Sequence, residues 1–395
     1  MTVLNVPPDL STPTGATASV LVDQPGAPDV LVFRGHDAER RHDELEERIR
    51  VSSLIHWHLN LGHHTTALAV AKTWSGRIPQ IGAVHHVGDG DEHLVEALLG
   101  TVDIIHVMAT DVAEQVSELV SSTQIEVLPY VTEGWDLPRR PRGHHVPRIG
   151  WCGNSERVGD RKNLHVLLEA LHAVQHAGRP IEVLVQGRIP METLDLARRH
   201  SIPVRFQPWV RSTRRLDFYD EIDLYVSPST IEGGPLPVLE AIARGCPAAF
   251  TRTGVGRDLL EAGVGLELSM HDPAAQAESI GTLLAEPTAL ARAGLDMRER
   301  ARPLVGPGLI ARYIQMWERR GMSRESSGIE VERVHKWNQH ERRIDAFEEA
   351  RLLARRGRRR ESIARMFEDR AWGADRARRW GGFREIALEL VRTHH

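Results

Sequence analysis

Residues 229–247 read STIEGGPLPVLEAIARGCP and carry the densest local signal in the chain. An apolar strand ends at the start of this segment, and two glycines follow it. Pro235 and Pro237 stand where a helix can begin without their missing N–H groups. The apolar spacing then predicts a helix over 236–244, which Gly245 ends. The segment is therefore typical of a strand–loop–helix unit.

The loop of this unit has the composition of an anion site flanked by two carboxylates. Gly233 and Gly234 precede the helix N-terminus, so a ligand can approach backbone amides there, and the helix dipole favours an anion. Glu232 lies in the loop, and Glu240 lies within the first two turns of the helix. A sugar nucleotide suits this layout, because its diphosphate stands between a ribose and a hexose that both carry hydroxyls.

Outward from this segment, the second half of the chain alternates apolar runs with helical patterns. A helix that begins near Asn163 shows the i, i+3, i+4 apolar pattern and is stopped by Gly178, and another is expected near 191–199. The expected strands are RIGWCG (148–153), IEVLVQG (181–187), PVRFQPW (203–209), EIDLYVSPS (221–229) and PAAFT (247–251).

The first half shows the same alternation, which predicts a parallel sheet with helices on its faces. The expected strands are DVLVFR (29–34), SLIHWH (53–58), QIGAVHH (80–86), VDIIHVMA (102–109) and IEVLPY (125–130), with helices near 37–50, 65–74, 92–99 and 111–121. The proline-rich, basic stretch at 137–148 is the best linker. We expect two doubly wound α/β domains, 1–140 and 141–322, with ligands at the carboxyl ends of the strands.

From about Pro273 onward the pattern is almost entirely helical. Residues 323–395 are expected to form a helical C-terminal segment that packs back on the N-terminal domain. Its basic part, RLLARRGRRRESIAR (351–365), leaves contact with nucleic acid or an anionic membrane surface open, but its apolar residues favour packing on the body of the protein.

The composition is that of a globular protein whose net charge is too small to produce a strong electrostatic field. The chain has 395 residues, 41% hydrophobic and 26% charged residues, and a net charge of −4, so nothing favours nucleic acid as a partner. Cys152 and Cys246 form no metal spacing. No secretory signal and no apolar run long enough for a bilayer are evident, which predicts a cytoplasmic protein. Lysine occurs only at Lys72, Lys162 and Lys336, so a lysine is mildly informative.

Glu232-x7-Glu240, followed by Ala-Ile-Ala-Arg-Gly and a proline-led strand, resembles the E-x7-E signature of the retaining glycosyltransferases of family 4 (group 1). The resemblance extends through TRTGVGRDLLEAGVGLELSMHDP (251–273). It covers 148–320 well and 50–135 loosely. The family implies the GT-B fold, in which two Rossmann-like domains face each other across a cleft. It also implies transfer of a sugar from a nucleoside diphosphate sugar, such as a UDP- or GDP-sugar, to a small-molecule or glycan acceptor that the sequence does not identify.

The resemblance assigns donor-binding roles along this segment. Glu240 would bind the ribose hydroxyls, and Glu232 would face the donor hexose as a catalytic residue. Amides around Gly233 and Gly234 would hold the sugar and the diphosphate, where the family often has Phe-Gly in place of Gly234 and Pro235. The other donor-binding residues expected are Leu236 on the helix and Gly153 and Asn154 after the strand RIGWCG.

A basic clamp for the diphosphate is expected in GWCGNSERVGDRKNLHVLLEAL (150–171), where the family places an arginine and a lysine. Lys162 stands at the helix start, and Arg157 precedes it at a family-like spacing. Arg161 is the rival of Arg157, because this loop is longer than usual.

The N-terminal half offers histidines for the transferred sugar and a weak acceptor site. By resemblance, His85 points into the cleft near the sugar as a catalytic residue, with His86 as its competitor on the acceptor side. A histidine there can donate to a hydroxyl or titrate. The glycine-rich acceptor loop of the family is poorly matched, and only Gly15 in TPTGATA (12–18) is available.

The resemblance implies transfer with retention, no required cofactor and no metal. Asp89-Gly90-Asp91 looks like the metal-binding D-x-D of another glycosyltransferase fold, but a polar loop explains it better. Two other functions stay open: a GT-B sugar-nucleotide epimerase or hydrolase, and a non-enzymatic binding module that uses the basic C-terminal helices. The sequence does not indicate the oligomeric state.

Overall fold

The computed structural model describes residues 2–6, 29–33, 35–58, 65–87, 100–119, 124–137, 139, 141, 145–154, 159–207, 213–321 and 338. The chain divides into two compact units. One unit holds Met1–Leu59, Gly76–Pro79 and Arg320–His395, and the other holds Asn60–Ser75 and Gln80–Arg319. The second unit contains the whole of the segment quoted above and the strands on which it depends.

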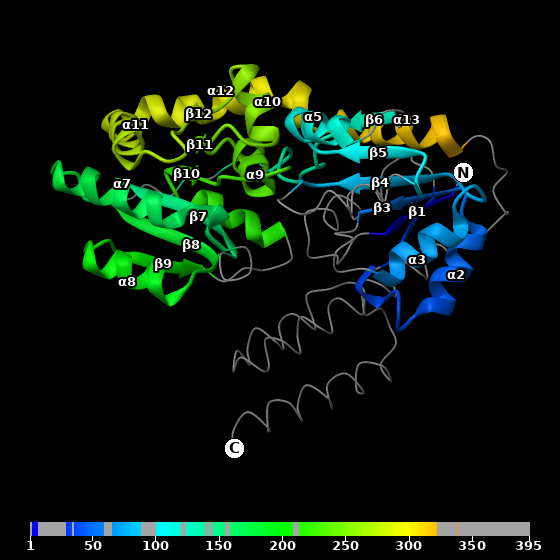
Figure 1. The fold of residues 1–395 in the computed structure, drawn as a ribbon. Coiled ribbons are helices and arrows are strands. Elements are labelled where there is room, and N and C mark those ends of the chain that lie inside the picture. The colour runs from blue at the N-terminus through cyan, green and yellow to red at the C-terminus, as the bar shows by residue number, and fades with distance from the viewer. Residues whose placement is uncertain are drawn as a thin grey trace, which may run out of the picture. The chain divides into compact units, whose positions relative to one another are not determined.

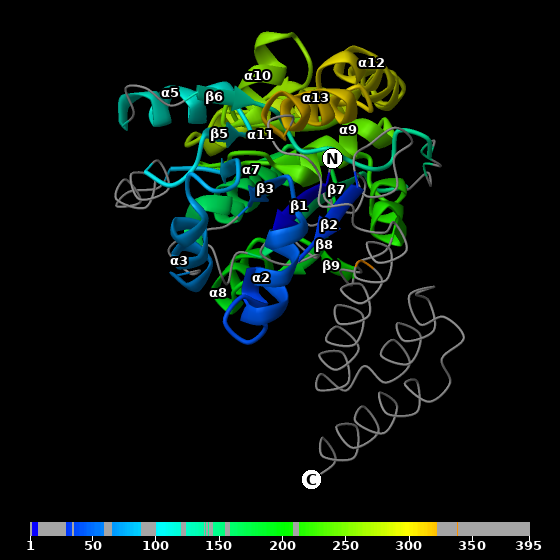
Figure 2. The ribbon, with the colours of Figure 1, turned by 90° about the vertical axis from the view of Figure 1, so that its right-hand side faces the viewer.

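The first of two six-stranded sheets has the strand order β2-β1-β3-β4-β5-β6 (Figure 1; β2 is labelled in Figure 2). The pairs β1–β2, β1–β3, β4–β5 and β5–β6 are parallel, as the alternation of strand and helix predicted. The strands are β1 (Thr2–Val6), β2 (Asp29–Val32), β3 (Leu54–Trp57), β4 (Gln80–Val84), β5 (Ile104–Val107) and β6 (Gln124–Val127).

Strand β1 was not predicted, although it lies between β2 and β3 and all five of its residues are buried. Its sequence, TVLNV, is a short apolar run of the kind that a fully buried strand requires. The other five strands were predicted and are confirmed. The described helices of this part are α2 (His42–Val51), α3 (Thr65–Trp74) and α5 (Thr110–Leu119), while the helix predicted near 92–99 lies outside the described residues.

The second sheet has the order β12-β11-β10-β7-β8-β9, and all its neighbouring pairs are parallel. Its strands are β7 (Arg148–Asn154), β8 (Glu182–Arg188), β9 (Val204–Gln207), β10 (Leu224–Ser227), β11 (Ala248–Phe250) and β12 (Leu266–Glu267). The last of them was not predicted. The stretch 137–148, which the sequence marked as a linker, follows β6 and ends at the first residue of β7.

Helices of the second sheet are α7 (Leu164–His176), α8 (Met191–Arg199), α9 (Leu236–Arg244) and α10 (Val255–Glu261). Helix α7 buries the apolar stripe predicted for it and packs against α11 (Pro273–Ala285) (Figure 2). Gly178 follows α7 with a φ of 80°, a left-handed conformation that glycine adopts without strain. The helix end predicted from this glycine is confirmed.

The helical pattern predicted after Pro273 is confirmed as far as the structure describes it, by α11, α12 (Pro287–Val305) and α13 (Leu309–Gly321). The C-terminal segment expected over 323–395 lies outside the described residues, except for Asn338. The amide of Asn338 donates to Val30 O at 2.7 Å and accepts from Val32 N at 2.9 Å. Among the described helices, none has both the length and the apolar character needed to cross a membrane.

Candidate active site

Two loops at the carboxyl edge of the second sheet bring Lys162 and Glu232 together. Lys162 ends the 3-10 turn Gly159–Lys162 after β7, and Glu232 lies in the loop after β10, the neighbour of β7 in the sheet. The carbonyl oxygen of Arg161 accepts from the backbone N–H of Thr230 at 2.8 Å and from its hydroxyl at 3.3 Å. This backbone contact fastens one loop to the other, in the place where ligands of such sheets bind.

The Nζ of Lys162 donates to the Oε1 of Glu232, and only 15% and 9% of the two side chains are exposed. Burial alone would raise the pKa of Glu232, but the charge and hydrogen bond of Lys162 outweigh it, with help from Ser229 and Arg161, so this pKa lies below its ordinary value. Glu232 is therefore a carboxylate at neutral pH. In that form it can accept hydrogen bonds but has no proton to give.

The two glycines of this loop are packed against residues that follow β4 and β6. A β-carbon on Gly233 would lie 1.4 Å from the carbonyl oxygen of His85, and one on Gly234 would lie 2.6 Å from the ring of Tyr130. The sequence suggested that these glycines let a ligand approach the backbone. The structure gives a second reason for them, which is the close approach of His85 and Tyr130.

Helix α9 begins as predicted, with Pro235 as its N-cap and Leu236 as its first residue. Neither Pro235 nor Pro237 has an N–H group, and the N–H of Val238 donates to Pro235 O at 2.8 Å. An anion at this N-terminus would therefore find few backbone donors, because two of the first positions are prolines and the Val238 N–H bonds within the turn. Cationic side chains must supply more of the attraction than at an ordinary helix N-terminus.

Glu240 lies on the buried face of α9 and is 4% exposed. Its Oε1 accepts from Nε of Arg215 at 2.8 Å, and its Oε2 accepts from the hydroxyl of Tyr219 at 2.9 Å. Burial raises the pKa of Glu240, although Arg215 and Tyr219 oppose the rise. Arg215 also pairs with Glu133 at 2.9 Å. Each carboxylate oxygen has a second lone pair, so Glu240 keeps the capacity to accept from two more donors.

Arg215 and Tyr219 were not predicted from the sequence; they lie in the 3-10 segment Thr213–Asp220 before β10. Neither is close to Glu240 in the sequence, and no periodicity connects them with it. The one available signal was an arginine and a tyrosine within a short segment that enters a core strand.

His85 and His86 follow β4 and contact two different partners. The Nδ1 of His85 is 2.7 Å from the hydroxyl of Tyr130, and Nε2 of His86 is 3.2 Å from Nη1 of Arg161. Arg161, the rival of Arg157 for the clamp, thus contacts one of the two predicted histidines. Tyr130 was not singled out from the sequence, although it ends the run IEVLPY that predicted β6.

The remaining predicted residues are only partly described. Gly153 lies in β7, where Gly187 of β8 has a φ of 133° and a β-carbon on it would come within 1.9 Å of the Gly153 carbonyl oxygen. The backbone of Asn154 ends β7, and its side chain lies outside the described part of the structure. Arg157, Gly15 and the Asp89-Gly90-Asp91 loop also lie outside the described residues.

The loop of Glu232 is supported from behind by α10. The N–H of Val255 donates to Gly233 O at 2.8 Å. Helices α10 and α5 exchange carboxylates at their N-termini, which we call the reciprocal caps: Asp111 on α5 accepts from Gly254 N at 2.7 Å, and Asp258 on α10 accepts from Thr110 N at 3.0 Å. These bonds hold the loop at a fixed position relative to α5.

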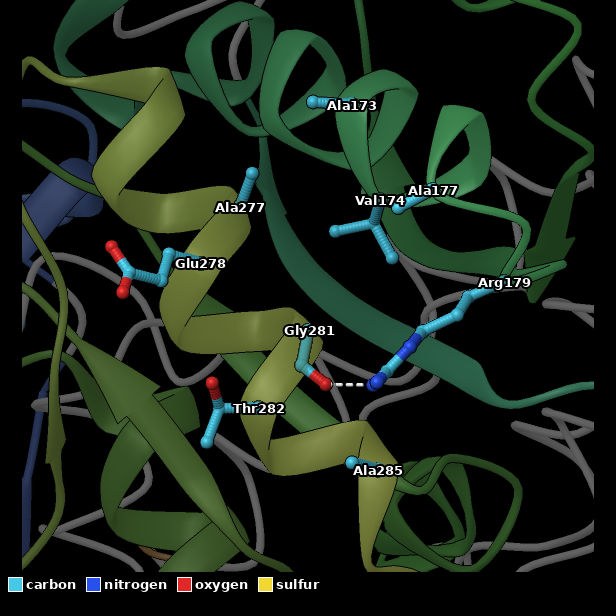
Figure 3. A pocket seen from close by; sticks show the side chains of 9 residues that line it. All are labelled: Ala173, Val174, Ala177, Arg179, Ala277, Glu278, Gly281, Thr282 and Ala285. Atoms are coloured by element: carbon cyan, nitrogen blue, oxygen red, sulfur yellow. Dashed lines mark hydrogen bonds between the residues drawn. The ribbon is translucent and has the colours of Figure 1, made fainter.

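A separate depression of about 430 Å³ lies between α7 and α11 (Figure 3). Its walls are small side chains such as Ala173 and Ala277, and Arg179 donates to the carbonyl oxygen of Gly281 at its rim. It contains none of the residues that the sequence singled out, so the edge of the second sheet remains the candidate site.

Residues 146–286, which include every residue of this edge from β7 onward, match the family model described as glycosyl transferases group 1. Comparison with curated proteins gave no significant match. The fold is that of the GT-B glycosyltransferases, because solved structures of this class superpose on most of the chain.

Three solved structures illustrate the likeness. HepE of Anabaena, in complex with UDP and glucose, has a TM-score of 0.64 at 15% identity, over 80% of this chain and 98% of HepE. Sucrose-phosphate synthase of Thermosynechococcus elongatus has a TM-score of 0.63 at 16% identity, over 82% and 100%. TarM of S. aureus has a TM-score of 0.51 at 13% identity, and the match covers 61% of this chain but only 51% of TarM. At these identities the likeness concerns the fold.

Proposed function

Because residues 146–286 match the family model of the group 1 glycosyl transferases, we propose that this chain transfers a glycosyl group from a nucleoside diphosphate sugar to an acceptor, with retention at the anomeric carbon. The observation that carries the proposal is the contact between Lys162 and Glu232 at the carboxyl edge of the second sheet. It places a cation and a carboxylate side by side near a helix N-terminus. The cation can bind a diphosphate, and the carboxylate can accept a hydrogen bond from a sugar hydroxyl.

The diphosphate is proposed to lie against Lys162, Arg161 and the N-terminus of α9. Proline at two positions of that N-terminus leaves few amides, so the side-chain cations carry most of the charge compensation. As the glycosidic bond breaks, negative charge grows on the leaving diphosphate, and a fixed cation stabilises that charge most at this moment. Arg157 stays a predicted member of the clamp.

The sugar is proposed to lie against Glu232 and His85, and the ribose against Glu240. A carboxylate that Lys162 keeps ionised accepts hydrogen bonds from hexose hydroxyls. Glu240 would accept from the ribose through the lone pairs that Arg215 and Tyr219 leave. Retention needs no protein nucleophile in this proposal, since the departing phosphate takes the proton of the acceptor.

The structure of HepE was solved with UDP and with glucose, so a UDP-sugar is our first proposed donor and a GDP-sugar the second. We propose that no metal or other cofactor is required and that the acceptor is a small molecule or a glycan. The acceptor site, with His86 and Gly15 as candidates, a cytoplasmic location and any peripheral membrane contact stay predictions.

A panel of UDP-, GDP-, ADP- and TDP-sugars tests the proposal in two steps. A thermal-shift screen identifies the donor first, because a ligand that binds the folded state raises Tm. Release of the nucleoside diphosphate is then followed with and without candidate acceptors, and with and without EDTA. Proton NMR of the product gives the anomeric configuration, and an inverted product would refute retention.

Two variants connect that activity with the site. Lys162→Ala is expected to lower kcat/KM by about 100-fold, because it removes a group that stabilises the leaving diphosphate. Lys72→Ala, which changes an exposed lysine of α3, is the matched control and is expected to keep wild-type activity. Equal activity of Lys162→Ala and Lys72→Ala would refute the site. Product formed from the donor alone, at the rate seen with acceptor, would indicate an epimerase or hydrolase.

A further inference from the structure

Tyr130 and His85 form a hydrogen-bonded pair that contacts the loop of Glu232. The Tyr130 hydroxyl is 2.7 Å from Nδ1 of His85, and the two rings lie 5.8 Å apart at an interplanar angle of 28°. Tyr130 is 5% exposed. The loop touches both members, since Gly233 packs on the His85 carbonyl and Gly234 on the Tyr130 ring. The pair therefore belongs to the candidate site by contact.

The direction of this hydrogen bond follows from the environment of the phenol. Burial, and to a lesser extent the charge of Glu232, raise the pKa of Tyr130, so its hydroxyl keeps its proton. A buried O–H group without an acceptor is costly. Among the described residues, Nδ1 of His85 is the one acceptor that the Tyr130 hydroxyl reaches. The phenol consequently donates, and Nδ1 accepts through its lone pair.

An imidazole nitrogen that accepts a hydrogen bond carries no proton. In the neutral ring the proton must then be on the other nitrogen, Nε2. We infer that Tyr130 is a positioning residue that holds His85 as the Nε2–H tautomer, so that His85 presents a hydrogen-bond donor to the sugar that is transferred. The identity of the ligand rests on the proposed function, whereas the tautomer does not.

This assignment decides between the two roles that a histidine could have here. A general base needs an unprotonated nitrogen facing the proton that it removes. In the assigned tautomer, Nδ1 is occupied by Tyr130 and Nε2 already carries a proton. His85 then acts as a fixed donor to a sugar oxygen and does not deprotonate the acceptor, which agrees with a mechanism in which the leaving phosphate takes that proton.

Nitrogen-15 NMR of protein labelled at histidine tests the tautomer directly, because protonated and unprotonated ring nitrogens have well-separated chemical shifts. The protein has 21 histidines, so the His85 signals are identified by their loss in His85→Gln. In the wild type we expect a protonated Nε2 and an unprotonated, hydrogen-bonded Nδ1. In Tyr130→Phe we expect the hydrogen-bond shift of Nδ1 to disappear. A protonated Nδ1 in the wild type would overturn the inference.

Tyr313→Phe is the matched control for Tyr130→Phe. The Tyr313 hydroxyl is also buried, donates to Pro129 O at 3.2 Å, and is 3.4 Å from Nε2 of His106. Its loss therefore weakens the support of the residue next to Tyr130 without removing the bond to His85. If Tyr313→Phe changed the His85 signals as Tyr130→Phe does, loop position and not the phenol proton would set the tautomer.

Kinetics show whether Tyr130 acts through His85. Tyr130→Phe is expected to lower kcat/KM about fivefold, the value of one ordinary hydrogen bond. In the His85→Gln background the same change is expected to have no further effect, since the amide of glutamine donates without needing Tyr130. A fivefold loss in that background too would overturn the positioning role. If the protein transferred no sugar at all, the NMR result would still stand, so the two failures are distinguishable.

Discussion

Gly233→Ala tests the packing of the candidate site most directly. The added β-carbon would lie 1.4 Å from the carbonyl oxygen of His85, whereas real Cβ atoms essentially never come within 3.0 Å of a non-bonded heavy atom. The two backbones must therefore separate by about 1.6 Å, because a packed interior has no space to absorb the methyl group. The backbone of Gly233 is not left-handed, so the effect is one of space alone.

The separation moves His85 away from the loop that carries Glu232. A misplacement on the order of 1 Å costs about 100-fold in rate at an active site, so we expect kcat/KM to fall about 100-fold. Overpacking of this kind destabilises by about 1–3 kcal/mol, which leaves most of the protein folded at 25 °C. The assay is release of nucleoside diphosphate from the donor found in the screen, with Tm measured on the same samples.

Gly281→Ala is the control, since Gly281 lies on α11 and a β-carbon there would meet nothing within 4 Å. Alanine in a helix is favoured over glycine by about 0.5–1 kcal/mol, so this variant should keep its activity and gain slightly in Tm. If Gly233→Ala kept both the activity and the Tm of the wild type, the close contact between Gly233 and His85 would not exist in solution.

Two further predictions concern the charged pairs. Arg215→Met leaves Glu240 buried without its cation, so it should destabilise the protein by about 3 kcal/mol and weaken donor binding measured by calorimetry. Arg148→Met is the control, because it removes a comparable ion pair, with Glu182, at the opposite end of β7. Equal donor binding by both variants would contradict the role of Arg215. For Glu232, the lowered pKa means that its ion pair stabilises the fold at neutral pH and that this contribution is lost as the pH falls below the ordinary glutamate value of 4.5. In Lys162→Met, the free energy of unfolding, measured with urea, should therefore fall less steeply as the pH is lowered than in the wild type. An unchanged pH dependence would show that the pair contributes nothing to stability.

Most of the fold could be predicted, because its signals are local. Ten of the strands were predicted from short runs rich in apolar and β-branched residues, and Gly178 and Gly245 end helices where the chain has to adopt a positive φ. Strand β1 was overlooked because its five residues stand alone at the start of the chain, with no preceding helix to complete the alternation. Strand β12 has only two residues and no pattern of its own.

The site could be predicted only in part, because its contacts join residues that are distant in the sequence. Glu232 and Lys162 were both proposed from motif context, but nothing in their spacing showed that they would touch. The partners of Glu240 and His85 were missed for the same reason: Arg215 precedes Glu240 by 25 residues and Tyr130 follows His85 by 45. The glycines at 233 and 234 were explained by an approaching ligand, whereas their neighbours in the fold are parts of the protein itself.

The reciprocal caps have a consequence for where an anion can settle on this edge. The carboxyl groups of Asp111 and Asp258 each accept from a backbone N–H at the start of the other's helix. A diphosphate that approaches α5 or α10 meets a terminus that is already neutralised, so these two helices do not compete for it. In the proposed function, the diphosphate of the donor would then bind at α9, whose N-terminus has fewer amides but adjoins Lys162. Two acidic residues outside the proposed donor contacts would in this way disfavour binding of the diphosphate at the wrong helix.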